Sequence, residues 1–317
     1  MPTRLIALRK SIMVQGVKIA VNNEGVSEIV DVNPATGEVI ARVACSTRAQ
    51  VDDAVAAAKS IQPSWAALEL AERAELVRLA IRRIAESGSD ALARLITQEM
   101  GKTLGEAQAE VADNADMDEY ISLVKEANEP EVHGGSVIVR HAHGVVSICA
   151  PWNYPVEEIV LLSIPALIAG NAIVVKPSEV VPLSGEFVVA AIMGGLNDRF
   201  PGLVSLLQGD GDVGSYLVQH PDVHMAAFTG STATGAKILQ AASASLKRVV
   251  LECGGKDPMV VMGDADLDAA AKDAVDFSLA NCGQVCCAVE RVYVASEVLR
   301  AMMAQSWRNS PQFCTVL

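Results

Sequence analysis

The sequence has few cysteines for its length, few basic residues and no long uninterrupted apolar run. Seven cysteines in 317 residues are odd in number and too sparse for a disulfide framework, which indicates a reducing compartment. The chain has 25 Lys and Arg residues and 38 Asp and Glu residues, so its net charge is −13. Nucleic acid and anionic lipid are bound through basic side chains, and this charge balance disfavours both. We therefore expect a small-molecule or protein partner and a cytoplasmic location.

The most apolar stretch, residues 159–175, contains no charged residue but is shorter than the ~20 residues of a membrane-spanning helix. Pro165, Gly170 and Asn171 interrupt it. Its end, Ile173–Val175, is typical of a buried parallel strand that follows a buried helix. The sequence therefore predicts no membrane span.

The N-terminal segment is basic, because no acidic residue precedes Glu24. The basic residues there are Arg4, Arg9, Lys10 and Lys18. This balance allows an organellar targeting peptide, although serine, which such peptides favour, is scarce. The alternative is a short disordered leader followed by an edge strand at Val14–Val21.

The first half of the chain has a helical pattern from residue 46 to about residue 128, after a turn at Asn33–Gly37. Thr47 and Gln50 can form a capping box, Pro63 is expected to separate two helices, and Gly101 is placed to end one. These signals predict an N-terminal helical bundle.

From residue 137 onward, short β-rich runs alternate with helix-like stretches. These runs are Val137–Arg140, Val145–Ile148, Ala172–Val175, Leu203–Leu207, Ala226–Thr229 and Val249–Leu251. Such alternation predicts βαβ units and a parallel sheet. We therefore expect an α/β fold with a Rossmann-like parallel sheet, helices on both faces and a small β arm.

Two loops after predicted strands have nucleotide-binding features. Phe228–Gly235 is a glycine-containing turn that opens a helix, where backbone N–H groups and the Ser231 hydroxyl could hold a phosphate. An ordinary strand-to-helix turn explains this segment equally well. In Lys176–Glu179, Lys and Glu side chains could contact ribose hydroxyl groups, and an ordinary polar loop is again the alternative.

Three further segments carry reactive side chains. Asn281–Cys287 has three cysteines; its spacing does not suit structural zinc, so we expect no metal site, and buried inert thiols are the alternative to a nucleophile. Glu252 follows an apolar strand, where general bases commonly lie, and a solvated loop carboxylate is the alternative. Asn153, in a turn between Pro151 and Pro155, could donate a hydrogen bond to an oxyanion, and an ordinary turn-forming asparagine is the alternative.

Together, in this order and spacing, these segments resemble the aldehyde dehydrogenase superfamily of NAD(P)-dependent enzymes. The similarity extends from about Asn33 to Ala295. It implies Cys286 as the nucleophile, Glu252 as the general base and Asn153 as the oxyanion donor. The cofactor contacts that it implies are Trp152, Lys176, Glu179, Gly230, Ser231 and Gly235.

The resemblance also implies an activity and a domain organisation. An aldehyde would be oxidised to a carboxylic acid through a thiohemiacetal and a thioester on the cysteine. NAD is expected rather than NADP, because Glu179 would repel the 2′-phosphate of NADP. We expect an NAD-binding domain over residues 1–254, with an oligomerisation arm at about residues 134–148, and the start of a second α/β catalytic domain over residues 255–317.

This catalytic domain would be incomplete, because family members continue well beyond residue 317. Their Glu-x-Phe-Gly-Pro segment and their C-terminal strand, which pairs with a partner subunit, are missing here. Residues 308–317 match nothing expected at this place, which suggests a truncated product. A homo-oligomer is expected for the family. The alternative to an active enzyme is a non-catalytic fragment that binds nucleotide or pairs with full-length subunits.

Overall fold

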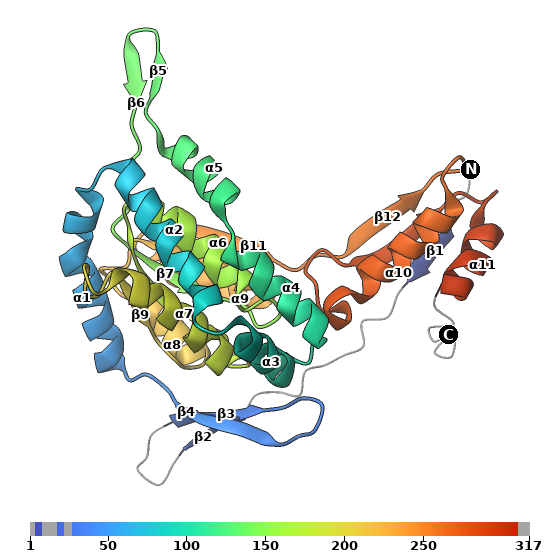
Figure 1. The fold of residues 1–317 in the computed structure, drawn as a ribbon, viewed down its shortest axis with the longest axis horizontal. Coiled ribbons are helices and arrows are strands. Elements are labelled where there is room, and N and C mark those ends of the chain that lie inside the picture. The colour runs from blue at the N-terminus through green and yellow to red at the C-terminus, as the bar shows by residue number, and fades with distance from the viewer. Residues whose placement is uncertain (1–3, 8–17, 22–26, 310–317) are drawn as a thin grey trace. The chain divides into compact units, whose positions relative to one another are not determined.

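A computed structural model describes residues 4–7, 18–21 and 27–309 of the chain. The chain forms two compact units (Figure 1). The larger one comprises Gln15–Glu252, and the smaller one comprises Met1–Val14 together with Cys253–Leu317. Among the described residues, no helix is both long enough and apolar enough to cross a membrane.

The larger unit is built on a five-stranded parallel sheet with the order β11-β10-β7-β8-β9. Every residue of the two strands β7 and β8 is buried, as expected of a parallel sheet that is covered on both faces. The strands are β7 (Val145–Cys149), β8 (Ala172–Lys176), β9 (Val204–Leu206), β10 (Met225–Gly230) and β11 (Arg248–Cys253).

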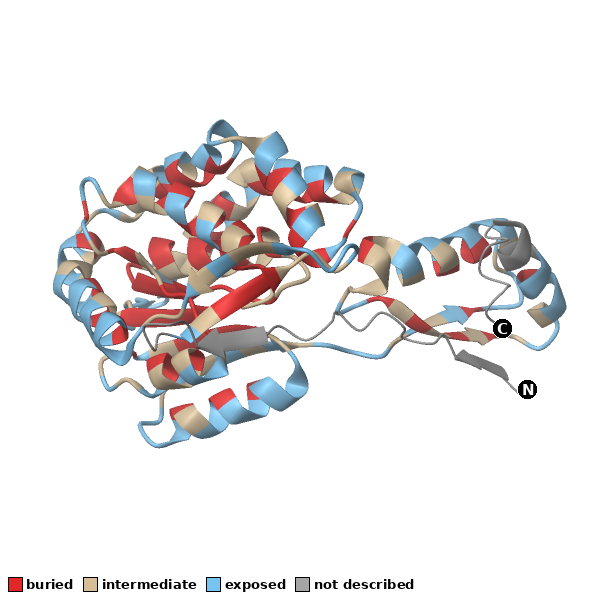
Figure 2. Cartoon of the chain, turned by 90° about the horizontal axis from the view of Figure 1, so that it is seen from below, coloured by how far each residue is buried: buried red, intermediate tan, exposed pale blue. Residues whose placement is uncertain are grey.

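Helices cover both faces of this sheet (Figure 2). The connecting helices are α6 (Glu157–Ile168), α7 (Pro182–Leu196), α8 (Gly211–Gln219) and α9 (Thr232–Ser243). The chain moves outward from β7 to β9 through α6 and α7, and α8 then returns it to the other side of β7. Because such crossovers are right-handed, α6 and α7 lie on one face and α8 and α9 on the other. The predicted Rossmann-like α/β fold is confirmed.

The predicted helical part is confirmed as five helices. They are α1 (Arg48–Ala66), α2 (Leu70–Glu86), α3 (Ser89–Met100), α4 (Leu104–Ala115) and α5 (Asp118–Asn128). Thr47 and Gln50 form the capping box that begins α1, and Gly101 ends α3 with a left-handed φ of 84°. The expected break at Pro63 is wrong, because Pro63 lies inside α1. Tertiary packing outweighs the hydrogen bond lost at this proline: Trp65 is fully buried and its indole N–H donates to the Leu167 carbonyl at 2.8 Å.

A three-stranded antiparallel sheet precedes the helices. It contains β2 (Lys18–Val21), β3 (Ser27–Val32) and β4 (Val39–Ala44). The predicted turn at Asn33–Gly37 joins β3 to β4: the Asn33 side chain accepts from the backbone N–H of Ala35 at 2.9 Å, and Gly37 has a φ of 76°. Most of the predicted leader, and residues 14–17 of the strand expected at Val14–Val21, lie outside the described residues.

The small β arm is a hairpin of β5 (Glu131–His133) and β6 (Ser136–Ile138) (Figure 1). The predicted extent, about residues 134–148, is wrong at its C-terminal end, because Val145–Cys149 forms the central strand β7. A short β-branched run has the same pattern in an exposed arm and in a buried strand, so the pattern did not separate them.

Within its described residues, the smaller unit has a three-stranded sheet of order β1-β13-β12 and two helices. Its elements are β1 (Arg4–Ala7), β12 (Asp257–Val261), α10 (Leu267–Gly283), β13 (Val289–Val294) and α11 (Leu299–Asn309). β1 pairs with β13 in antiparallel orientation and β12 pairs with it in parallel orientation. We expected residues 1–254 in one domain and residues 255–317 in the other. The smaller unit instead begins at Cys253 and also includes the N-terminal strand β1, because β1 pairs with β13.

Candidate functional site

The order of strands reverses between β7 and β10 in the larger unit. In open α/β sheets, ligands bind outside the carboxyl ends of the strands at such a reversal. Pro151–Pro155 follows β7, and Ser231 follows β10. The sheet topology therefore brings two of the segments singled out in the sequence to the place where a ligand is expected.

The turn after β10 leads directly into α9. Ser231 is the N-cap residue, and its Oγ accepts a hydrogen bond from the backbone N–H of Thr234 at 3.2 Å. Gly235 is buried in the first turn, and its N–H donates to the Ser231 carbonyl at 2.9 Å. The first N–H groups of a helix and its dipole together attract anions, so this turn, which includes Gly230, is suited to a phosphate group.

The loop after β8 is held by Lys176, the last residue of that strand. Its buried ammonium group donates to the carbonyls of Pro177 at 2.8 Å and Gly209 at 2.7 Å. It also lies 3.4 Å from a carboxylate oxygen of Glu179, whose side chain is about one third exposed. Lys176 therefore fixes the loop from within, while Glu179 remains accessible to a ligand.

Asn153 lies in a turn that is anchored at both ends. Pro151 and Pro155 are buried, and Trp152 packs against the main hydrophobic core of the larger unit. At the start of the turn, the backbone N–H of Ala150 donates to the Lys176 carbonyl at 3.1 Å. The side chain of Asn153 is therefore presented by a well-supported backbone.

Glu252 lies near the end of β11, close to an acidic side chain of α6. The Glu158 carboxylate accepts from the Thr229 hydroxyl at 2.8 Å. Burial raises the pKa of Glu158, the Thr229 hydrogen bond lowers this pKa, and the charge of Glu252 raises it further. Glu252, Glu158 and Thr229 are thus grouped at one edge of the sheet.

Cys286 belongs to the smaller unit, in the segment that follows α10. Its side chain is exposed, and its carbonyl accepts from the backbone N–H of Gly255 at 3.1 Å. Asn281, Cys282 and Gly283 just before it have φ values of 54°, 59° and 73°. Consecutive left-handed residues of this kind are uncommon and cluster at functional sites, where surrounding structure maintains them.

The predicted residues are therefore divided between the two units. Asn153, Glu252 and the six expected cofactor contacts belong to the larger unit, and Cys286 belongs to the smaller one. Among the residues that the structure describes, no group of three or more His, Cys, Asp or Glu side chains is arranged to hold a metal ion.

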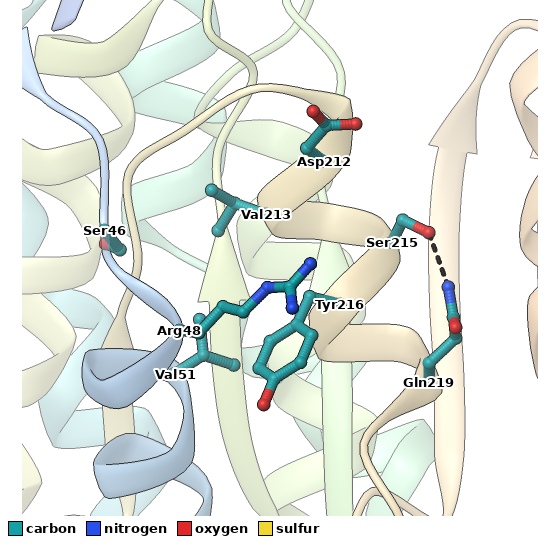
Figure 3. Close-up of a pocket in the computed structure, with 8 residues that line it drawn as sticks. All are labelled: Ser46, Arg48, Val51, Asp212, Val213, Ser215, Tyr216 and Gln219. Atoms are coloured by element: carbon teal, nitrogen blue, oxygen red, sulfur yellow. Dashed lines mark hydrogen bonds between the residues drawn. The ribbon is translucent and has the colours of Figure 1, made fainter. Parts of the chain in front are cut away.

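A cavity of about 330 Å³ lies between α1 and α8 and contains none of the predicted site residues (Figure 3). The Arg48 guanidinium lies over the Tyr216 ring at 5.0 Å from its centroid. The lining residues are Ser46, Arg48, Val51, Asp212, Val213, Ser215, Tyr216 and Gln219.

Sequence reasoning missed a buried ion pair next to the Asn153 turn. Lys102 and Glu110 form an ion pair with each other, and their side chains are 0% and 1% exposed. A signal was present, because Glu110 lies between Ala107, Val111 and Asn114 on the face of α4 that is buried. A charged residue on an apolar helix face is rarely buried without a partner.

The profile of the aldehyde dehydrogenase family matches residues 20–310. The chain belongs to the aldehyde dehydrogenase family. This membership confirms the resemblance found in the order of the five motifs.

Solved structures of aldehyde dehydrogenases share this fold. A mutant of aldehyde dehydrogenase C from Pseudomonas syringae, complexed with NAD+ and octanal, is 34% identical with a TM-score of 0.83, covering 90% of this chain and 59% of that one. Lactaldehyde dehydrogenase from Escherichia coli is 36% identical with a TM-score of 0.82, and the match covers 89% of this chain and 60% of that one. An NADP-dependent enzyme from Escherichia coli is 30% identical with a TM-score of 0.83, and the match covers 92% of this chain and 61% of that one. The chain thus spans about three fifths of the length of these relatives.

Proposed function

We propose that this chain oxidises an aldehyde to a carboxylic acid with NAD, with Cys286 as the nucleophile, Asn153 as the oxyanion donor and Glu252 as the general base. The observation that carries the proposal is the placement of Asn153 and Glu252 at the carboxyl edge of the parallel sheet, in a member of the aldehyde dehydrogenase family. The Pseudomonas syringae relative, which binds NAD+ and octanal, supports the same class of cofactor and substrate.

The residues of the larger unit fit a dinucleotide, so we propose this unit as the NAD-binding domain. The first turn of α9, with Ser231 as its cap, offers N–H groups to a pyrophosphate. The accessible carboxylate of Glu179 can accept hydrogen bonds from ribose hydroxyl groups, and the buried Lys176 keeps its loop in place. NAD, when bound, supplies the hydride acceptor.

The acylation half of the reaction uses Cys286 and Asn153. The Cys286 thiolate attacks the aldehyde carbon, and a carbon–sulfur bond forms while the carbonyl electrons move to oxygen. The Asn153 amide and the Cys286 backbone N–H donate to this oxyanion. Loss of the hydride from the thiohemiacetal leaves a thioester on Cys286.

The deacylation half uses Glu252. The carboxylate takes a proton from a water molecule, whose oxygen attacks the thioester carbon. The carbon–sulfur bond breaks, the carboxylic acid leaves, and Cys286 is restored as a thiolate.

The proposal also covers the assembly of the chain and its cellular location. The arm β5–β6 exposes Val132, Val137 and Ile138, with 71%, 57% and 48% of each accessible, and we assign it to contact with a second copy of the chain. The cytoplasm is the proposed location, because a reducing compartment keeps catalytic thiols reduced.

The decisive experiment is to purify the 317-residue chain, add NAD with a panel of aldehydes, and follow NADH absorbance. We expect NADH formation that is lost in Cys286→Ala and retained in Cys287→Ala, which removes the neighbouring, equally exposed cysteine. NAD binding without NADH formation would instead select the non-catalytic fragment.

A further inference from the structure

The turn that carries Asn153 has no side-chain cap from its own residues where it enters α6. Val156, at the N-cap position, has an apolar side chain and so cannot accept from the free N–H groups of the first turn. The acceptor comes from α4 instead. Glu110 Oε1 accepts from the backbone N–H of Val156 at 2.8 Å and of Glu157 at 3.3 Å.

The same carboxylate is held by a second buried group. Glu110 Oε2 accepts from the Lys102 ammonium, and both side chains are almost completely buried. Charge-assisted hydrogen bonds of this kind are shorter and stronger than neutral ones. Glu110 is therefore fixed on one side by Lys102 and fixes the start of α6 on the other.

Lys102 also touches the turn directly. Its Nζ lies 4.0 Å from the centroid of the Tyr154 ring, within range of a cation–π interaction. Tyr154 follows Asn153 in sequence, and its carbonyl accepts from the backbone N–H of Glu158 at 3.1 Å. The ion pair thus contacts the turn at Tyr154 and again at Val156, the first and third residues after Asn153.

We infer that Glu110, oriented by Lys102, is a positioning residue that fixes the backbone of the Asn153 turn for the oxyanion. The role in the reaction rests on the proposed function, whereas the capping of the turn does not. Neither residue contacts the reacting atoms, so the effect is transmitted through the backbone of residues 154–157. A misplacement of about 1 Å in a catalytic group can cost 10²-fold in rate.

The chain offers a matched control in Glu99. This carboxylate is also buried, and it caps another helix in the same way, accepting from the backbone N–H groups of Leu183 and Ser184, each at 2.8 Å. The helix that it caps is α7, which does not carry Asn153. Glu110→Gln and Glu99→Gln therefore make the same substitution at two equivalent caps.

The first measurement is hydrogen–deuterium exchange, which needs no turnover. We expect Glu110→Gln to accelerate exchange in residues 151–158 and not in residues 181–186, and Glu99→Gln to do the reverse. Gln is close to Glu in size and retains an acceptor oxygen, so both variants should fold. Unchanged exchange in residues 151–158, or equal acceleration of both segments in both variants, would overturn the positioning role.

The second measurement is steady-state NADH formation. We expect Glu110→Gln to lower kcat roughly 10-fold to 100-fold with KM for NAD within about twofold, because only the oxyanion donor is displaced. We expect Glu99→Gln to leave kcat unchanged. A purely structural role of Glu110 would leave kcat of the folded variant at the wild-type value and refute the inference. Absence of turnover in the wild-type chain would refute the proposed function instead, and the exchange result would then decide the capping role.

Discussion

Glu99, at the end of α3, accepts a hydrogen bond of 2.8 Å from the backbone N–H of Ser184, at the start of α7. This carboxyl group is buried, and burial together with the nearby Asp31 raises its pKa to about 8, although its hydrogen bonds lower it. Burial also raises the pKa of Asp31 to about 6. Two acidic groups from β3 and α3 thus meet inside the larger unit.

The stability of the chain should therefore fall as the pH rises. The usual pKa values of these groups, 3.8 and 4.5, apply in the unfolded chain, so the folded chain holds the protons more tightly. The resulting stabilisation is fully present below about pH 4 and is lost as the pH approaches about 8. We expect Glu99→Gln to flatten this decline.

The measurement is urea unfolding of the wild-type chain and of Glu99→Gln at about pH 5 and about pH 8. For each protein, the change in the free energy of unfolding between the two pH values is determined, and the two changes are compared. This comparison cancels the contribution of carboxylates elsewhere in the chain. If Glu99→Gln shows the same pH dependence as wild type, Glu99 does not titrate in this range.

Gly185 in α7 is required by a close approach to the loop after β8. A Cβ atom at this position would lie 2.2 Å from Cβ of Pro177. We expect Gly185→Ala to lower the free energy of unfolding by about 1–3 kcal/mol, because the rigid proline cannot yield without moving the loop. Chemical denaturation measures the change, and NAD affinity should fall with it.

The control for this substitution is Gly105, which lies in α4, where an added Cβ atom would meet no other atom within 4 Å. Gly105→Ala should raise stability by about 0.5–1 kcal/mol, because alanine favours the helix. Equal effects of the two substitutions would show that the contact with Pro177 is unimportant.

Replacement of the proposed oxyanion donor should slow turnover strongly. We expect Asn153→Ala to lower kcat by about 10²–10³-fold, the usual cost of losing one such donor. The measurement is NADH formation under saturating aldehyde. Asn128→Ala is the control, since the Asn128 amide donates to the Val124 carbonyl at the end of α5, away from the proposed site. Full turnover of Asn153→Ala would refute the assignment of Asn153 as the oxyanion donor.

The choice between NAD and NADP should depend on Glu179. We expect the wild-type chain to bind NAD more tightly than NADP and Glu179→Gln to narrow the difference, because the variant lacks the charge that repels the 2′-phosphate. Titration calorimetry with each nucleotide gives both dissociation constants. Glu186→Gln, an exposed position on α7, should leave their ratio unchanged, and equal or tighter binding of NADP by wild type would contradict the preference for NAD.

Local patterns predicted much of this fold. The capping box of Thr47 and Gln50, the stop at Gly101 and the strand Ala172–Lys176 all follow from residues close together in sequence. Pro63 shows where such reasoning fails, because the burial of Trp65 outweighs the local cost of a proline in a helix. The same holds for Val145–Cys149, whose pattern suits an arm or a central strand.

The sequence by itself determined the family, the alternation of strands and helices, and the identity of the candidate residues Asn153, Glu252 and Cys286, because motif order and periodicity are properties of neighbouring residues. Only the tertiary structure decided that β1 joins β13 and that Glu110 caps α6. Those contacts join segments far apart in the chain. Whether a charged side chain is buried, and which backbone N–H groups it then satisfies, depends on how distant elements pack together.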